Sequence, residues 1–380
     1  MEEKLKLYLQ AMISNEGSDL HLKSGSNVRV RVHGILKLLG KDILSTEQMD
    51  KLAQEIMTPD QYKKLKQDRN LDFSYSTKNE YRFRVNFFYQ IDGLSAVFRT
   101  IPANILSIEQ LKLPKAVNDL VNIQRGLVLV TGITGSGKST TLAAILDKIN
   151  REEKKHIITV EDPVEFIHKD KGCLINQRSI GQDTHSFADA LRAALREDPD
   201  IILVGEMRDL ETIDIAMHAA NTGHLVLSTL HTLDAKETID RIVGMFPNDE
   251  QNRIRISLAS VLGGILSQRL IPTIHGGRVA AIEILKKTAR IEQLIAENRD
   301  TEIPDALSDG KEIYGTQTFD QALLDLLKKG EIDDKTALKY TTNPADMKLK
   351  MQGIGKDAIF DENADNKDLD FFDFKDDNEE

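Results

Sequence analysis

Cysteine is almost absent from this sequence of 380 residues, in which Cys173 is the only one. A single cysteine excludes an internal disulfide and any zinc site built from several cysteines. No run approaches 18 uninterrupted apolar residues, so the sequence predicts no membrane-spanning helix. The N-terminus, Met1–Lys6, is charged and has no apolar core of the kind found in signal peptides. These absences argue against export and predict a cytoplasmic protein.

The sequence also lacks an excess of basic over acidic residues. The formal net charge is −11, and residues 357–380 alone carry 11 acidic and 2 basic side chains, which leaves a balance of −2 for the rest. A chain without a basic excess lacks the charge that gathers a phosphate backbone, so we expect no nucleic-acid partner. The acidity belongs to a tail, 353–380, that is too charged to pack alone and that we expect to be disordered. The tail either contacts a basic partner or serves as a solubilising end.

The first hundred residues predict a small α+β domain. Its clearest strand is Tyr81–Gln90, in which Tyr81, Phe83, Val85, Phe87 and Tyr89 alternate with polar residues. Further strands are expected at Asp19–Lys23, Val28–Val32, Leu71–Tyr75 and Leu94–Phe98, and helices at Thr46–Met57 and Pro59–Gln67. A linker is expected over 101–112, because Ile101-Pro-Ala-Asn interrupts the pattern.

A second domain is expected over 113–352, where apolar runs alternate with helical patterns. The runs are Leu127–Thr131, Ile157–Val160, Ile201–Val204 and Leu225–Thr229. Buried runs separated by helices predict an α/β fold, with a mainly parallel sheet covered on both faces. Near its end, Thr318 and Gln321 form a capping-box pattern that opens a helix over Phe319–Lys329.

The segment Gly132-Ile-Thr-Gly-Ser-Gly-Lys-Ser139 satisfies the P-loop pattern, with a strand before it and a helix, Ser139–Ile149, after it. Its glycines let successive backbone N–H groups face phosphate oxygens, and the start of the helix adds its positive end. Lys138 is expected to contact the β- and γ-phosphates of ATP, and the Ser139 hydroxyl to ligate Mg²⁺. The expected nucleotide-binding residues are Gly132, Ile133, Thr134, Gly135, Ser136, Gly137, Lys138, Ser139 and Thr140.

Two carboxylate residues lie where ATP hydrolysis requires a group that positions water and holds the metal. Glu206 follows the strand Ile201–Val204, and Glu161 follows the strand Ile157–Val160. In an open parallel sheet, ligands bind beyond the carboxyl ends of the strands, so both should face the P-loop. One of them would position the attacking water, and Glu206 would also hold Mg²⁺, directly or through water. The sequence leaves open which of the two activates the water.

Two histidines and three arginines are further candidates. His224 and His231 flank the strand Leu225–Thr229, where a histidine is either a structural hydrogen-bonding residue or a functional one. The arginines lie on or beside strands of the first domain, either solvated or reaching the phosphates of a neighbouring subunit. They are Arg82, Arg84 and Arg99.

Taken together, these residues resemble a known family, the RecA-like ATPases of type IV pili and type II secretion, and within it the PilT/PilU pilus-retraction branch. The resemblance extends from about residue 3 to about residue 352. The segments that carry it are the P-loop, Ile158–Phe166, Val204–Asp209, Thr222–Thr232, Gly17–His21 and Arg82–Asn86.

The resemblance implies a PAS-like N-terminal domain, a RecA-like ATPase domain and a homo-hexameric ring with ATP between subunits. It implies that Glu206 and Glu161 handle metal and water, and that His224 and His231 sense the γ-phosphate. It also implies that the three arginines complete the site. The implied activity is ATP hydrolysis that retracts type IV pili and drives twitching motility. The implied partners are an inner-membrane platform protein, which the ring meets without spanning the membrane, and a paralogous retraction ATPase.

The sequence departs from the PilT pattern in one helix, Arg290–Glu297. PilT-type members carry arginines at the two positions held here by Glu292 and Ala296. Gln317–Leu323 and Asn343–Met351 resemble the accessory paralogue PilU, whereas Arg196–Asp200 and Gly205–Asp209 look more like PilT. We therefore lean towards a PilU-like member, as a main or accessory motor.

Three other functional hypotheses compete with a retraction motor. A pilus assembly or type II secretion ATPase is disfavoured by the short N-terminal domain and the single cysteine, because those proteins carry a longer N-terminal region and a four-cysteine zinc insertion. A regulatory subunit that binds nucleotide without hydrolysing it is disfavoured because every expected catalytic residue type is present. A nucleic-acid motor with the same core lacks the basic groove.

Overall fold

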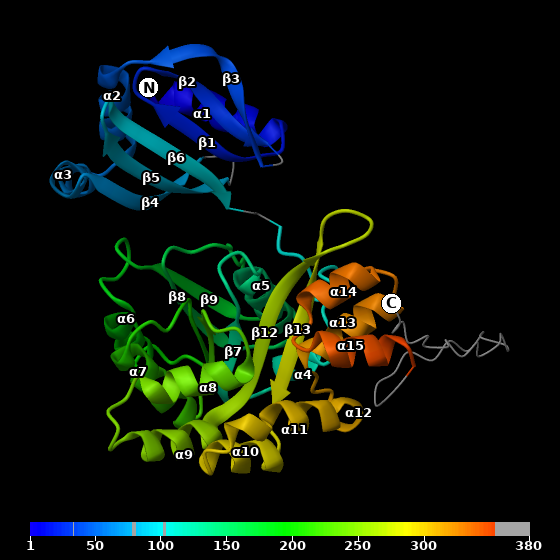
Figure 1. The fold of residues 1–380 in the computed structure, drawn as a ribbon. Helices are drawn as coiled ribbons and strands as arrows, with labels where there is room; N and C mark the ends of the chain where they lie inside the picture. The colour runs from blue at the N-terminus through cyan, green and yellow to red at the C-terminus, as the bar shows by residue number, and fades with distance from the viewer. Residues whose placement is uncertain (33, 78–80, 102–103, 354–380) are drawn as a thin grey trace, which may run out of the picture.

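Two domains make up the described part of the chain (Figure 1). The computed structural model describes residues 1–32, 34–77, 81–101 and 104–353. Apart from Gly353, the tail that we expected to be disordered lies outside the described residues. Within the described ranges, no helix is long and apolar enough to cross a membrane.

A six-stranded antiparallel sheet forms the core of the N-terminal domain, in the order β3-β2-β1-β6-β5-β4. The strands are β1 (Gly17–Lys23), β2 (Ser26–Val32), β3 (Ile35–Leu44), β4 (Asn70–Ser76), β5 (Arg82–Gln90) and β6 (Gly93–Ile101). The alternation expected along β5 is confirmed for Phe83, Val85 and Phe87, which are fully buried. It is wrong for Tyr81, because the strand begins one residue later and leaves this ring exposed.

Three helices pack on this sheet and complete its hydrophobic cluster. They are α1 (Glu2–Ser14), α2 (Thr46–Ile56) and α3 (Pro59–Asp68). The starts of α2 and α3 follow from local sequence, because Ser45 with Gln48 and Thr58 with Gln61 both form capping boxes. The two later helices and five of the six strands were expected from the sequence, so the α+β prediction for this domain is confirmed.

The second domain contains a seven-stranded sheet in the order β13-β12-β7-β11-β10-β8-β9. The strands are β7 (Gly126–Thr131), β8 (His156–Glu161), β9 (Leu174–Ser179), β10 (Ile201–Val204), β11 (Leu225–Leu230), β12 (Leu262–Pro272) and β13 (Arg278–Lys286). Neighbouring strands from β12 to β9 run parallel, and β13 runs antiparallel to β12. The mainly parallel sheet predicted from the sequence is therefore confirmed.

Helices cover this sheet on both faces (Figure 1). Along β7, Leu127 and Leu129 belong to one buried cluster, and Val128 and Val130 to another, as expected of a strand buried on both sides. The helices are α4 (Val117–Val121), α5 (Lys138–Glu152), α6 (Phe187–Ala194), α7 (Leu210–Asn221), α8 (Ala235–Gly244), α9 (Gln251–Val261), α10 (Ala289–Ala296), α11 (Ile303–Asp309), α12 (Lys311–Tyr314), α13 (Phe319–Lys328), α14 (Asp334–Tyr340) and α15 (Pro344–Met351), with a 3₁₀ turn at Asp300–Glu302.

The last three helices pack on the β12–β13 hairpin as a separate small core. The capping box of Thr318 and Gln321 opens α13 as predicted. At the other end of the domain, Ile108 and Leu113 are buried in the core beside α4 and α5. The expected linker, 101–112, thus includes a segment that packs on the ATPase domain.

Candidate active site

The P-loop joins the end of β7 to the start of α5. Gly135 and Gly137 have φ angles of +80° and +90°, which L side chains rarely adopt, so the curl of the loop depends on glycine at both positions. Lys138 is the first residue of the helix, one earlier than expected. Its Nζ donates to the carbonyl oxygens of Gly132 at 2.8 Å and Ile133 at 3.2 Å. Burial lowers the pKa of Lys138, an effect that Glu206 and Glu165 oppose.

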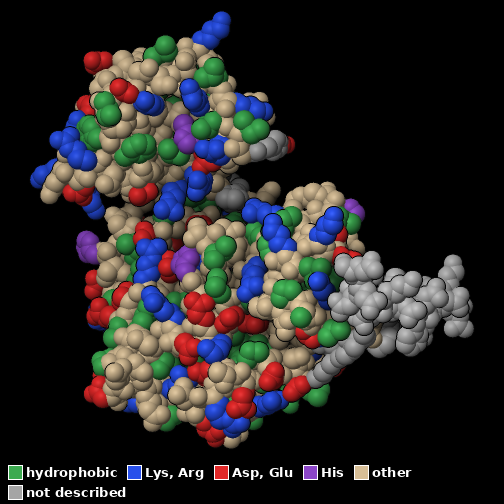
Figure 2. Space-filling model, viewed as in Figure 1, with side chains coloured by type: hydrophobic (Ala, Val, Ile, Leu, Met, Phe, Trp, Pro, Cys, Tyr) green, Lys and Arg blue, Asp and Glu red, His purple; other side chains and the backbone are tan. Residues whose placement is uncertain are grey.

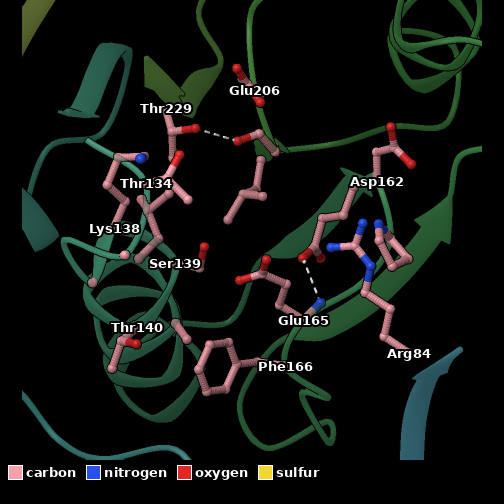
Figure 3. A pocket seen from close by; sticks show the side chains of 18 of the residues that line it. Arg84, Thr134, Lys138, Ser139, Thr140, Asp162, Glu165, Phe166, Glu206 and Thr229 are labelled. Carbon is pink, nitrogen blue, oxygen red and sulfur yellow. Dashed lines mark hydrogen bonds between the residues drawn. The ribbon is translucent and has the colours of Figure 1, made fainter. Parts of the chain in front are cut away.

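A cavity of about 640 Å³ opens beside this loop, at the carboxyl ends of the parallel strands (Figure 3). The residues expected at the site that line it are Thr134, Gly135, Gly137, Lys138, Ser139, Thr140, Glu161, Glu206, His231, Arg84 and Arg99. Three residues expected to bind nucleotide, Gly132, Ile133 and Ser136, do not line it. The first two turn their carbonyl oxygens towards Lys138, and the side chain of Ser136 is buried behind the loop.

Glu206 lies two residues beyond β10 and faces the P-loop. Its Oε2 accepts a hydrogen bond from Arg208 Nη2 at 2.8 Å, and its Oε1 lies 3.2 Å from His231 Nε2. Burial alone would raise the pKa of Glu206, but Arg208, His231 and Lys138 more than offset it, so its pKa lies below the usual value. A carboxylate that stays ionised beside a lysine is suited to hold a cation or to orient water.

Glu161 ends β8, on the neighbouring strand. Its Oε1 accepts from Thr159 Oγ1 at 2.7 Å and from Gln177 Nε2 at 3.3 Å, and its Oε2 from the Glu165 backbone N–H at 3.3 Å. Despite these bonds, burial raises the pKa of Glu161. Glu206 and Glu161 therefore have pKa values shifted in opposite directions, as groups with different proton-transfer roles do.

The two histidines lie at opposite ends of β11. His231 follows the strand and lines the cavity. His224 precedes it, and its Nδ1 lies 3.0 Å from the carbonyl oxygen of Ala219 at the end of α7. Seven residues along a strand span about 20 Å, so the structure does not bring His224 to the cavity. The rule that ligands bind beyond the carboxyl ends of parallel strands distinguishes the two residues, because only His231 follows such an end.

Two of the three expected arginines reach the cavity from the N-terminal domain. Arg84 and Arg99 lie opposite each other on β5 and β6 and line it together. Arg99 Nε is held at 2.7 Å by Oδ1 of Asp19, whose side chain is buried. Arg82 is the first residue of β5 and lines a different cavity, with its Nε donating to Ser76 Oγ at 3.0 Å. The structure therefore places Arg84 and Arg99 in the cavity beside the P-loop of their own chain. The role of these arginines at a neighbouring subunit stays a prediction.

Basic side chains gather where the two domains face each other. Figure 2 shows lysine and arginine on both sides of the boundary between them.

Several residues that line the cavity were not singled out from the sequence. They include Asp162, Glu165, Phe166, His168, Arg208 and Arg278. The first five lie in or beside segments that carried the resemblance, but Arg278 starts β13, and nothing in the local sequence connects it to the P-loop. His168 is half-buried, and this desolvation lowers its pKa to about 4.

The oxygen donors of the cavity fit a magnesium–nucleotide pair. Mg²⁺ in such sites is held by one or two protein oxygens and by substrate phosphates, and keeps several waters. Ser139 offers a hydroxyl on the first turn of α5 and Glu206 an ionised carboxylate across the cavity. In the described part of the chain, no group of three or more histidine, cysteine, aspartate or glutamate side chains forms an all-protein metal cage.

Comparison with known proteins decides the family. The family described as "Type II/IV secretion system protein" matches residues 1–306. The type IV pilus retraction ATPase PilT of Pseudomonas aeruginosa is 48% identical over 88% of this chain and 98% of its own length. This chain belongs to the PilT/PilU family. The family member PilU of the same organism is 39% identical over 92% of each chain.

A solved structure from this family shares the fold. The pilus retraction motor PilT with bound ADP superposes with a TM-score of 0.83 at 44% identity, covering 89% of this chain and 97% of that one. The resemblance stated from the motifs is thereby confirmed, as is the α/β fold. Identity over the matched residues is higher with this PilT than with this PilU, and the PilU-like character of the C-terminal segments stays a prediction.

Proposed function

We propose that this chain hydrolyses ATP in a homo-hexameric ring and uses the energy to retract type IV pili, which drives twitching motility. The observation that carries the proposal is one cavity in which the P-loop, two carboxyl groups from adjacent strands and two arginines of the other domain meet. A site shared by two domains couples the state of its ligand to their relative position, which is what a motor requires.

Different residues of the cavity bind the phosphates, the metal and the attacking water. Backbone N–H groups of the P-loop and Nζ of Lys138 hold the phosphates, and the Ser139 hydroxyl and Glu206 hold the metal. Bound Mg²⁺ would supply positive charge against the charge that develops on the phosphates. One of the two carboxylates, Glu206 or Glu161, orients the attacking water and accepts its proton. His231, which contacts both Lys138 and Glu206, is placed to respond to the γ-phosphate.

Arg84 and Arg99 give the N-terminal domain its part in the reaction. Both are positive, and both enter the cavity from a sheet that belongs to the other domain. With ATP bound, we propose that they are drawn to its phosphates, and that release of phosphate lets the domains separate. Such a cycle in each of six subunits would act on a platform protein at the cytoplasmic face of the inner membrane. A paralogous retraction ATPase is a further partner, with this chain as the main or the accessory motor.

Phosphate release by the purified chain with Mg²⁺ and ATP tests this proposal. Lys138→Ala and Glu206→Ala should each abolish turnover, while Arg192→Ala should retain it. Arg192 is a suitable control because it is exposed, forms ion pairs with Glu211 and Asp189, and does not line the cavity. Wild-type turnover in the first two variants would contradict the assignment of the site.

Deletion of the gene, followed by a count of surface pili, tests the biological role. An excess of non-retracting pili would identify a main motor, and normal piliation with weakened retraction force would identify an accessory one. Loss of surface pili would contradict a role in retraction and would point to assembly.

A further inference from the structure

Gln268 is a buried amide in the middle of β12, next to the strand that leads into the P-loop. Its side chain is 3% exposed. β12 runs parallel to β7, with Ser267 beside Thr131, the last residue before the loop. Gln268 does not line the nucleotide cavity, and no motif in the sequence singles it out.

Both ends of this amide bind the P-loop segment. Nε2 donates to the carbonyl oxygen of Ser136 at 2.7 Å, and Oε1 accepts from Thr141 Oγ1 at 2.7 Å. The orientation of the amide follows from its partners, because a carbonyl oxygen only accepts and would repel Oε1. One side chain therefore brackets residues 137–140, whose N–H groups are expected to face the phosphates.

The glycines of the loop show how closely it packs on Gln268. A Cβ at Gly137 would lie 2.8 Å from Nε2 of Gln268, and a Cβ at Gly132 would clash with its backbone oxygen. These glycines have positive φ angles, +90° and +141°. The loop thus needs glycine there for its own conformation and because β12 occupies the space.

We propose that Gln268 is a positioning residue for the nucleotide phosphates. It acts through Ser136 and Thr141, which it holds in one arrangement, so that the N–H groups between them keep the geometry that binds phosphate. The proposal rests on the nucleotide site proposed above and adds a residue 132 positions away in sequence from the loop carbonyl it binds. Removing the amide leaves a buried carbonyl and a buried hydroxyl without partners, so the loop loses a constraint on both sides.

A matched pair of variants separates positioning from simple stability. Gln268→Met keeps the length and packing of the side chain but removes both hydrogen bonds. Gln317→Met is the control, because Gln317 is another buried glutamine of this domain whose Nε2 donates to a backbone carbonyl, that of Ile282, at 2.7 Å. Gln317 does not line the cavity. Both variants should lower the melting temperature, Gln268→Met by more, since it loses two buried side-chain hydrogen bonds and Gln317→Met loses one.

The decisive measurement is the Kd for fluorescent ADP with Mg²⁺, with kcat for ATP, on the full-length assembly. Gln268→Met should raise Kd and lower kcat, each by about tenfold, because the phosphate-binding geometry is looser. Gln317→Met should leave both within about twofold of wild type. If Gln268→Met binds ADP and turns over like the control, Gln268 is merely structural and the inference is overturned.

A double-variant cycle identifies the contact that transmits the effect. Thr141→Val should also raise the Kd for ADP. In the double variant with Gln268→Met, the fold-increase in Kd should be smaller than the product of the two single-variant increases. Factors that simply multiply would place the influence of Gln268 outside this contact and count against the proposal. Wild-type protein that fails to bind labelled ADP would instead overturn the proposed nucleotide site, and the inference with it. The two failures are therefore distinguishable.

Discussion

The Nε2 atom of His231 lies 3.2 Å from Oε1 of Glu206. The other ring nitrogen, Nδ1, lies 3.5 Å from Nζ of Lys138. A lysine ammonium only donates hydrogen bonds, so Nδ1 is the acceptor and the ring proton resides on Nε2, which donates to Glu206. One imidazole thus connects the P-loop lysine with the carboxylate beyond the neighbouring strand.

His231→Ala should lower kcat by about 10- to 100-fold, because Lys138 and Glu206 lose the group that holds them relative to the γ-phosphate. The Kd for ADP, which has no γ-phosphate, should change by less than about threefold. Steady-state phosphate release and ADP titration measure the two quantities. His224→Ala is the control and should keep kcat within about twofold, since this residue lies at the far end of β11. Equal losses in both variants would contradict the separation seen in the structure.

The three arginines of the N-terminal domain should differ in their effect on turnover. Arg99→Ala and Arg84→Ala should each lower kcat by about 100-fold, as expected when a positive charge is removed from a phosphoryl-transfer site. Arg82→Ala should lower it by no more than about threefold, because its side chain lies in another cavity. Asp19→Asn should have an intermediate effect through Arg99. Similar kcat values for Arg82→Ala and Arg84→Ala would show that the domains meet differently during turnover.

Glu283 should make the stability of the protein fall as pH rises. This buried carboxyl group accepts a hydrogen bond from the Ala235 backbone N–H at 2.7 Å, and burial raises its pKa from 4.5 to about 7. The folded state therefore holds a proton that the unfolded state releases. Its stabilising contribution is complete below pH 4.5 and is lost as pH rises through about 7.

Glu283→Gln removes this titration and retains an oxygen that can accept from Ala235. We expect the free energy of unfolding, measured with denaturant at pH 5 and pH 8, to rise for the variant relative to wild type. The relative rise between the two pH values should be at most about 3 kcal/mol. The difference between the two proteins is informative because every other titrating group cancels. Parallel pH profiles would contradict the raised pKa.

The buried pair Arg255–Asp300 should be far more important for stability than an exposed pair on the same helix. Arg255 Nη1 and Asp300 Oδ2 lie 2.5 Å apart, and the two side chains are only 9% and 5% exposed. Asp300→Ala leaves the buried guanidinium of Arg255 with only the more distant carboxylate of Asp240, at 3.9 Å, and should cost up to about 3–5 kcal/mol in the free energy of unfolding. Glu250→Ala, which breaks the exposed pair with Arg253, should cost less than about 1 kcal/mol. A cost below that of the exposed pair would contradict the burial of Arg255.

Four parallel strands of the second sheet, β7, β8, β10 and β11, were predictable almost to the residue, whereas β12, which also lies inside this sheet, was not predicted. The run Ile201–Val204 coincides with β10, and Leu127–Thr131 differs from β7 by one residue. Parallel strands covered on both faces are almost continuously apolar, so an uninterrupted apolar run in the sequence predicts a buried strand. The opposite holds for β3, which was not predicted. It lies at the edge of its sheet, and most of its side chains are exposed, so no alternation marks it.

The P-loop and the carboxylates Glu161 and Glu206 could be identified from the chain alone, because each follows an apolar strand and parallel strands end at one edge of a sheet. The same rule favours His231 over His224, because only His231 follows the carboxyl end of its strand. The register of β5 with β6 pairs Arg84 with Arg99, whereas Arg82 lies in another cavity. Gln268 reaches the loop only because β12 lies beside β7. Local sequence carries the chemistry of single segments, whereas strand order and domain contact bring distant residues together, and no short stretch of sequence encodes those contacts.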